Sequence, residues 1–567
     1  MADTPHTDPL LQLVIDHEVL SADQVQEVLD EQKLTGKPIQ HVLIDMGFFN
    51  EDQVLELIAG YLGTRVINLP ATDIPPDVVH GVPASVARMY NVVPVSATAT
   101  SVELAVSSLV NPQIMDELMF VLTRAVTFVV AREDDIKTCI NQFYGDESDT
   151  VSDMLKAIEN EMEHSDTLAV GEEDVKGLEE AAGSAPVIRF VNLVLYQAVN
   201  DRASDIHFEP FEKEFKIRYR VDGALYEMRP PGKRLALPVI SRIKVMSGLN
   251  IAERRMPQDG RIQISIGGRP IDLRVSSLPT QFGESVVLRV LDRSVVSLEI
   301  ENLGMPEDVY EQFTQDIDKP NGIIVVTGPT GSGKTTTLYS GLRRINTIEQ
   351  KILTAEEPVE YDIEGLIQVP ISESSGNTFP IVLRAFLRQD PDVMMIGEIR
   401  DLETAQIAIQ ASLTGHLVFS TLHTNDAAGA VTRLIDMGVE PYLISSTMEA
   451  VLGQRLVRTI CEHCKTPYRP DKALLDRLNL KDADVGDRNF FYGTGCKACN
   501  DTGYHGRKGI YEYLGIRQPI RDLIDQRKPT LIIRDKAVEL GMRTLRQDGI
   551  RNVLDGYTTV EEILKYT

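Results

Sequence analysis

A glycine-rich segment in the second half of the chain has the spacing of a phosphate-binding loop. It reads Gly328-Pro-Thr-Gly331-Ser-Gly333-Lys334-Thr335, a full match to G-x-x-x-x-G-K-[ST]. Glycines let backbone N–H groups close around an anion, and the start of a helix adds partial positive charge. We expect Lys334 to reach the β- and γ-phosphates of ATP and the Thr335 hydroxyl to bind Mg²⁺. The expected nucleotide contacts are Gly328, Thr330, Gly331, Ser332, Gly333, Lys334, Thr335 and Thr336.

Two apolar segments that end in carboxylates are suited to complete such a site. Residues 352–355 run into Glu356-Glu357, and residues 393–396 run into Gly397-Glu398. Carboxylates at two strand ends beside a phosphate loop suit Mg²⁺ positioning and activation of the attacking water. One such acid alone is more often a solvated strand end, but the neighbouring phosphate loop favours a functional role.

Four of the five cysteines form two Cys-x-x-Cys pairs, Cys461/Cys464 and Cys496/Cys499. Four thiolates in two pairs suit a tetrahedral zinc ion that is closed by protein ligands and is therefore structural. The pairs lie farther apart than in a compact zinc ribbon, so residues 465–495 between them are expected to form a long insertion. Redox cysteines are the alternative, but no thioredoxin-like strand precedes them. The fifth, Cys139, is interpreted as a core residue.

The elements that must position these residues are typical of an α/β protein. The β-branched run 322–327 predicts a buried strand that enters the phosphate loop, and 336–342 predicts the helix that follows it. Upstream, the patterning predicts a helix over 187–200, a strand over 215–221 and a hairpin whose strands, 261–266 and 270–275, are separated by Gly267-Gly268.

The first part of the chain combines short helices with a small α/β domain. Residues 10–63 contain a weak repeat about 29 residues apart, in which Ser21 and Asn50 are expected to cap helices. Residues 64–144 alternate between strand and helix patterns, with strands expected at 92–95, 102–106 and 125–130. Thirteen acidic residues and two lysines between 146 and 180 then predict a self-repelling linker.

The length and charge of the chain limit its class. At 567 residues it is expected to hold three or four domains, and its formal net charge of −27 disfavours generic nucleic-acid binding. The sequence contains no run of about 18 apolar residues, so it does not predict a membrane-spanning helix. Residues 1–10 lack the basic and apolar parts of a signal peptide, so we expect a cytoplasmic protein.

Several long motifs follow one another in a fixed order and resemble those of the secretion ATPase superfamily, which includes type II secretion ATPases and type IV pilus motor ATPases. The resemblance is strong over 185–567 and looser over 10–145. The motifs are Asp205-Ile-His-Phe-Glu-Pro, Arg218-Tyr-Arg-Val-Asp-Gly223, the phosphate loop, Thr354-Ala-Glu-Glu-Pro-Val-Glu-Tyr361, Leu387-Arg-Gln-Asp-Pro-Asp, Gly397-Glu-Ile-Arg-Asp401, Leu413-Thr-Gly-His-Leu and Ser420-Thr-Leu-His-Thr-Asn425.

This resemblance implies an α/β architecture with a RecA-like ATPase core. The implied parts are an N-terminal α/β regulatory domain over 1–144, an acidic linker over 145–184, a PAS-like middle domain over 185–300 and the ATPase domain over 301–567. The last part would carry the tetracysteine zinc insert, at about 455–510, and a helical C-terminal tail.

The resemblance also implies roles for individual side chains. Glu357 would activate water and Glu398 would act through Mg²⁺, although the usual Glu-Asp-Pro is here Glu356-Glu357-Pro358, which leaves the division between the two acids open. His416 and His423 fall in a histidine box that senses the γ-phosphate. The positions that match the family's arginine fingers are Arg274, Arg289 and Arg507, and surface ion pairs are their alternative role.

By the same resemblance, the chain is expected to be a hexameric motor that hydrolyses ATP to assemble type IV pili. It would act through an inner-membrane platform protein and associate peripherally with that membrane. The type II secretion motor is the alternative in the same enzyme class, and a nucleotide-gated adaptor without turnover is the alternative outside it. The intact Lys334, Thr335, Glu357 and Glu398 argue against the adaptor. Retraction motors generally lack the N-terminal domain and the cysteine insert.

Some members of the superfamily bind cyclic di-GMP through a tandem N-terminal motif that begins Arg-Leu-Gly. In this chain Pro9 and Leu11 replace the first arginine and glycine, and Pro38 and Gln40 replace those of the second copy. Loss of both arginines removes the expected guanine and phosphate contacts. We therefore expect the domain to dock a recruitment protein and not to bind cyclic di-GMP.

Overall fold

A computed structural model of the chain divides into two units, Met1–Val296 and Ser297–Thr567, each of which is described by itself. Most of the predicted linker lies outside the described residues, as do Pro38 and the Gly267-Gly268 turn. No helix in the described part is long and apolar enough to cross a membrane. The described residues are 9–16, 20–35, 39–72, 74–98, 100–110, 114–115, 118–119, 122, 124–144, 175–228, 231–266, 269–292, 298–372, 375–481, 485–486 and 488–567.

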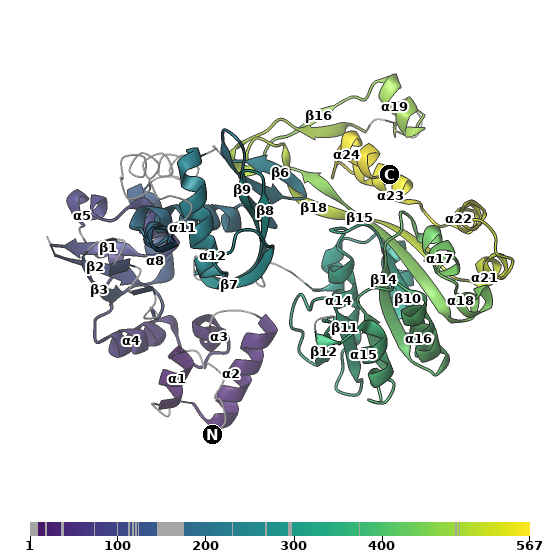
Figure 1. The fold of residues 1–567 in the computed structure, drawn as a ribbon, viewed down its shortest axis with the longest axis horizontal. Helices are drawn as coiled ribbons and strands as arrows, with labels where there is room; N and C mark the ends of the chain where they lie inside the picture. Colours follow the sequence, from purple (N-terminus) through teal and green to yellow (C-terminus); the bar gives the residue numbers. More distant parts are fainter. Residues whose placement is uncertain are drawn as a thin grey trace. The chain divides into compact units, whose positions relative to one another are not determined.

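The first unit begins with four helices, α1 (Pro9–Asp16), α2 (Ala22–Thr35), α3 (Ile39–Asp45) and α4 (Glu51–Leu62) (Figure 1). The predicted repeat is confirmed at the helix starts. Ser21 exchanges hydrogen bonds with Gln24 at the start of α2, and Asn50 does the same with Gln53 at the start of α4. Each pair is a capping box, which satisfies two backbone donors at once.

A three-stranded sheet follows, in the order β1 (Val93–Ala97), β2 (Ser101–Val106) and β3 (Ala125–Val130). These strands match the predicted ones to within about two residues. Helix α8 (Glu133–Tyr144) packs Cys139 into the core beside Ile136 and Ile140, as expected for a buried thiol.

A histidine–carboxylate pair joins α3 to α8. His41 Nε2 lies 3.2 Å from a Glu133 carboxylate oxygen. The hydrogen bond to Glu133 raises the pKa of His41 above 6.5, and the same bond lowers the pKa of Glu133 from 4.5 to about 2. The histidine contribution to stability is complete below pH 6.5 and is lost as pH rises through the folded pKa. The carboxylate contribution is complete above pH 4.5 and is lost as pH falls toward 2.

We therefore expect the pair to stabilise the α3–α8 contact most between pH 4.5 and 6.5. The measurement is hydrogen–deuterium exchange of α3 in the wild type and in His41→Gln, compared at equal pH. The protection lost in the variant should be larger at about pH 5.5 than at about pH 8.5. A loss that is the same at both values would contradict this linkage.

The middle part of the first unit is a six-stranded antiparallel sheet in the order β6-β5-β4-β9-β8-β7. Alternate strand residues form a core with helices α11 and α12, whereas the opposite set carries charged side chains. The elements are α11 (Ala185–Asn200), β4 (Asp205–Pro210), β5 (Phe215–Val221), β6 (Ala224–Glu227), α12 (Ala236–Met246), β7 (Gln258–Ile266), β8 (Arg269–Thr280) and β9 (Gly283–Asp292).

The second unit is built on a seven-stranded sheet in the order β12-β11-β13-β14-β10-β15-β18. Every neighbouring pair is parallel except β15 with β18. Helices α13 and α14 cover one face, and α15 to α18 cover the other. The strands are β10 (Gly322–Thr327), β11 (Ile352–Glu356), β12 (Leu366–Pro370), β13 (Val393–Ile396), β14 (Leu417–Leu422), β15 (Met448–Ile460) and β18 (Tyr504–Gly515). The helices are α13 (Glu307–Ile317), α14 (Lys334–Ile345), α15 (Phe379–Phe386), α16 (Leu402–Leu413), α17 (Ala427–Asp436) and α18 (Pro441–Thr447).

The cysteine insert is shorter than the sequence suggested. Residues 455–460 and 504–510 belong to β15 and β18 of the core sheet, so the insert proper begins at Cys461. It contains the two-stranded ribbon of β16 (Lys465–Tyr468) and β17 (Phe490–Gly493), with α19 (Lys472–Leu478) between them. The helical tail consists of α21 (Gln518–Asp525), α22 (Thr530–Glu539), α23 (Leu545–Leu554) and α24 (Val560–Tyr566) (Figure 1).

Candidate functional site

Four loops meet at the carboxyl edge of the core sheet, because β10, β11, β13 and β14 are parallel and in register. The phosphate loop follows β10, Glu357 follows β11, Glu398 follows β13 and His423 follows β14. Ligands of open α/β sheets bind at this edge. The predicted phosphate loop and both predicted acids therefore share one edge of the sheet.

The phosphate loop lies directly against β15. A Cβ atom at Gly328 would be 2.4 Å from the Gln454 carbonyl oxygen, and one at Gly333 would be 2.9 Å from the Gln454 side-chain nitrogen. Both glycines have positive φ, at 154° and 86°. Gln454 is itself fixed by the Thr337 hydroxyl on α14, at 2.8 Å. Only glycine fits these two positions, because both the space and the backbone conformation exclude a side chain.

Two buried polar groups in the loop fit an anionic oxygen ligand. The Ser332 hydroxyl is buried and has no hydrogen-bond partner among the described residues. Lys334 is 9% exposed and donates to the carbonyls of Gly328 and Pro329, at 2.9 and 3.1 Å. Burial lowers the pKa of Lys334, which the Glu398 carboxylate opposes. A buried ammonium and a free hydroxyl beside backbone that only glycine allows fit the phosphates of a nucleotide.

A second buried cation, Arg455, borders the loop and was missed from the sequence. Its guanidinium donates to the Asn425 carbonyl at 2.8 Å, and a Cβ at Gly328 would lie 3.2 Å from its Nη1 atom. Burial lowers the pKa of Arg455, which Glu512 and Asp426 oppose. Arg455 follows Gly453-Gln in the sequence, but nothing in the spacing of these residues indicates that it lies beside the phosphate loop.

The two adjacent acids of the first box have different surroundings. Glu356 is buried and accepts hydrogen bonds from the hydroxyls of Tyr339 and Thr354 and, at 3.1 Å, from the Gln368 amide. Glu357 points to the edge of the sheet, and its carboxylate lies 3.0 Å from Arg400 Nη1. Glu356 therefore has its acceptors occupied within the fold, whereas Glu357 is accessible for chemistry.

Arg400 bridges Glu357 and Glu398. Its second terminal nitrogen contacts Glu398, whose other oxygen lies 3.2 Å from His423 Nε2. The result is a row of alternating charge and hydrogen-bonding groups in the order Glu357, Arg400, Glu398, His423. Arg400 belongs to the Gly397-Glu-Ile-Arg-Asp401 motif, but nothing in the motif itself indicates that it bridges the two acids.

The two histidines of the histidine box lie at opposite ends of β14. His416 precedes the strand and hydrogen bonds to the Ala411 carbonyl at 2.8 Å and to Thr414 at 3.0 Å, at the end of α16. His423 follows the strand and is half-exposed beside Glu398. The six residues of β14 separate the two edges of the sheet, so His416 caps a helix and only His423 reaches the candidate site.

The predicted arginines lie in both units. Arg274 and Arg289 are opposite each other on β8 and β9 of the first unit. Arg289 donates to Asp205 on β4 at 3.1 Å. On the neighbouring strands, Arg220 of β5 lies opposite Asp205, and Arg261 of β7 lies opposite Arg274. A charged row thus crosses five strands of the middle sheet. Arg507, in the second unit, is exposed on β18 opposite Arg458.

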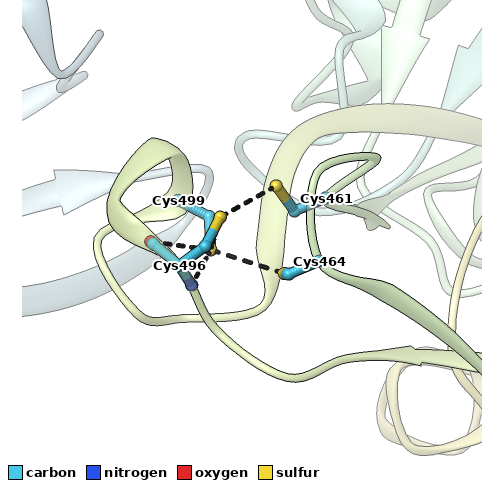
Figure 2. Close-up of side chains that lie close together, drawn as sticks. All are labelled: Cys461, Cys464, Cys496 and Cys499. Atoms are coloured by element: carbon cyan, nitrogen blue, oxygen red, sulfur yellow. Dashed lines mark hydrogen bonds between the residues drawn. The ribbon is translucent and has the colours of Figure 1, made fainter.

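The four cysteines gather into one cluster in which all ligand atoms lie within 4.8 Å of one another. The pairs from the two knuckles face each other (Figure 2). Sulfur–sulfur distances are 3.8 Å for Cys461–Cys496, 3.9 Å for Cys464–Cys499 and 3.7 Å for Cys496–Cys499. Tetrahedral zinc with bonds of about 2.3 Å separates its sulfurs by about 3.8 Å, so the cluster fits structural zinc.

Backbone amides support one thiolate of this cluster. Burial raises the pKa of Cys499, but hydrogen bonds from the N–H groups of Cys496 and Gly503 outweigh it, and the pKa falls to about 7. Both amide nitrogens lie 3.3 Å from the sulfur. Donors to a ligating sulfur orient it and stabilise its charged form.

Comparison with known proteins gives two family matches. Residues 180–565 match the family described as Type II/IV secretion system protein, and residues 62–150 match the MshEN domain. The first match spans the middle domain, the phosphate loop, the acidic boxes and the cysteine cluster.

Individual relatives cover most of the chain. The type IV pilus assembly ATPase PilB of Myxococcus xanthus is 40% identical over 98% of both chains. The type II secretion system protein HxcR of Pseudomonas aeruginosa is 49% identical over 77% of this chain and 88% of its own. Among solved structures, the Legionella pneumophila ATPase DotB superposes with a TM-score of 0.50 at 22% identity, covering 66% of this chain and 94% of its own, which supports the fold.

Proposed function

Because the chain belongs to the type II/IV secretion system family of ATPases, we propose that its ATP hydrolysis drives assembly of a type IV pilus. The observation in favour of this choice is the match to a pilus assembly ATPase over 98% of both chains, slightly more than the 94% of both chains matched by the type II secretion system protein E of Xanthomonas campestris. The MshEN match over 62–150 lies within that shared length.

The type II secretion motor is the second candidate. It is favoured by the higher identity, 49%, of the secretion protein HxcR over the part that it shares with this chain. Both candidates use the same chemistry and differ in the filament that they assemble.

We propose the following roles for the site residues. Lys334 binds the β- and γ-phosphates, and Glu357 accepts a proton from the attacking water. A magnesium ion, when bound by Thr335 and Glu398, would neutralise phosphate charge. His423 contacts Glu398 and reports on the γ-phosphate.

The proposed motor is a homo-hexamer. In the assembled ring, Arg274, Arg289 and Arg507 supply positive charge to the transferring phosphoryl group. The motor acts on an inner-membrane platform protein, and its N-terminal domain docks a recruitment protein. Cyclic di-GMP is not expected as a ligand, since Pro9 and Pro38 replace the two arginines.

The experiment that tests the proposal is deletion of the gene in its own organism, followed by separate assays of sheared surface pilin and of secreted proteins. We expect loss of surface pilin with secretion intact, restored by the wild-type gene and not by Lys334→Ala. Lost secretion with intact pili would instead assign the type II secretion role. Restoration by Lys334→Ala would contradict a motor that depends on ATP.

A further inference from the structure

A buried carboxylate, Glu512, connects the edge of the candidate site to the C-terminal tail. Glu512 is 2% exposed and lies on β18 opposite Gly453 of β15, which in turn lies opposite Thr327 at the end of β10. A Cβ at Gly453 would be 3.3 Å from the Ala427 nitrogen and 3.5 Å from Glu512 Cβ. The start of α17 is therefore packed closely onto this point of the sheet.

Each oxygen of Glu512 accepts one backbone N–H from a different helix. Ala427, the first residue of α17, donates to Oε1 at 2.8 Å, and Leu545, the first residue of α23, donates to Oε2 at 3.1 Å. The first N–H groups of a helix have no partner within it. In both helices the N-cap side chain binds a later amide: Asp426 binds Gly429 and Thr544 binds Gln547. Glu512 thus supplies the acceptor for the N–H of the first residue of both helices.

Helix α17 follows directly on the loop that carries His423. Within that loop, the Thr424 N–H donates to the Thr327 hydroxyl at 3.0 Å, and the Asn425 carbonyl accepts from Arg455 at 2.8 Å. The loop is therefore fixed to the strand before the phosphate loop, to β15 and, through α17, to Glu512. Only Thr424, Asn425 and Asp426 separate His423 from the first residue of α17.

We infer that Glu512 is a positioning residue for ATP hydrolysis: it holds the His423 loop and helix α23 of the tail in one arrangement, so that the tail controls turnover. Glu512 does not touch the reacting atoms in this scheme. It acts through His423, and the inference rests on the proposed role of that residue.

The test compares two isosteric substitutions of buried carboxylates. Glu512→Gln keeps the shape but leaves one acceptor oxygen, so one of the two helix amides loses its partner. Asp548→Asn is the matched control, because Asp548 is fully buried in α23 and its side chain accepts hydrogen bonds from the Tyr511 N–H on β18 and from Arg551, both at 3.0 Å, and neither partner lies in α17. Asparagine keeps one oxygen that can accept the Tyr511 N–H. Both substitutions are expected to lower the thermal midpoint.

The rate of ATP hydrolysis distinguishes Glu512→Gln from Asp548→Asn. We expect Glu512→Gln to lower kcat about tenfold with a change in KM for ATP below about twofold, because a displaced catalytic group costs rate more than binding. Asp548→Asn should keep kcat within about twofold of the wild type. Equal kcat values for the two variants would overturn the inference.

A second variant tests the hydrogen bond between Glu512 and helix α23 of the tail by itself. Proline is accepted at the first helical position, and Thr544 already has the extended backbone required before proline, with ψ 159°. Leu545→Pro therefore removes the N–H that reaches Glu512, together with a buried core side chain. Leu545→Ala, which also loses that side chain but keeps the N–H, is the control, and we expect kcat to fall further in Leu545→Pro than in Leu545→Ala. An unchanged kcat would show that α23 does not contribute to the positioning of His423.

Combination with His423→Ala completes the test. If Glu512 acts through His423, adding Glu512→Gln to His423→Ala should lower kcat no further, whereas independent effects multiply. Multiplied losses would overturn the inference while leaving the ATPase intact. Absence of turnover in the wild type would instead contradict the enzyme itself, so the two failures are distinguishable.

Discussion

Replacement of Glu357 by glutamine is expected to lower kcat for ATP hydrolysis by at least about 100-fold, because a positioned base contributes that much to a proton transfer. Glutamine keeps the size of the side chain but cannot accept the proton of the attacking water. Since Lys334 and the phosphate loop are untouched, ATP binding should persist. Phosphate release and the binding of a fluorescent ATP analogue measure the two properties separately.

The neighbouring acid provides the matched control. Glu356 is buried among the hydroxyls of Tyr339 and Thr354 and the amide of Gln368. Glu356→Gln leaves one of these donors without its acceptor, so we expect a loss of about 1–3 kcal/mol in the free energy of unfolding and a smaller loss of turnover. A larger fall of kcat in Glu356→Gln than in Glu357→Gln would reverse the assignment.

Replacement of Cys461 by serine is expected to reduce the zinc content from about one ion per chain to nearly none. Three thiolates and a poorly ligating hydroxyl do not close a tetrahedral site. Structural zinc contributes apparent binding free energies of about 10–16 kcal/mol in zinc fingers, so its loss should unfold the segment between Cys464 and Cys496. Metal analysis and limited proteolysis of this segment provide the measurements.

Cys139→Ser is the control for this substitution, because Cys139 lies in α8 of the first unit and outside the cluster. Its zinc content should equal that of the wild type. Zinc retained in Cys461→Ser, or an absence of zinc from the native protein, would show that the cluster has another role.

The parts of the site that follow from contiguous residues were predictable. The strand 322–327 and the phosphate loop are set by local sequence, and β10 has these bounds. The strand 393–396 was predicted in the same way and is β13. The two cysteine pairs also meet as expected, because a closed zinc site requires four ligands and the described part of the chain brings these four together.

The sequence indicated in part that Glu356 and Glu357 have different roles. Successive side chains of a strand point to opposite faces, so the two adjacent acids were expected to have different surroundings. Which one turns inward depends on Tyr339 and Gln368, which come from α14 and β12. Arg400 and Arg455 were not predictable for a related reason, since each is defined by partners that are distant in sequence.

The ends of the cysteine insert and the position of His416 both depend on the lengths of strands, which were not predicted from the sequence. β15 has 13 residues and carries polar side chains among its apolar ones, so the sequence does not mark where the core sheet ends. For His416, the signal was present: a six-residue strand separates it from His423, and about 3.3 Å per residue places the two at opposite edges.

The antiparallel pairing of β15 with β18 has a consequence for how this protein tolerates change. The insert leaves the sheet at Ile460 and returns at Tyr504, and these two residues are paired neighbours. Topologically, the whole cysteine-bearing segment is the enlarged turn of one hairpin. The entropy of closing such a turn grows slowly with its length, by about 0.6 kcal/mol for each doubling. Evolution can therefore lengthen, shorten or exchange the segment at little cost to the sheet, and the cysteine cluster near its base, if closed by zinc as it fits, would limit the freedom of the residues beyond it.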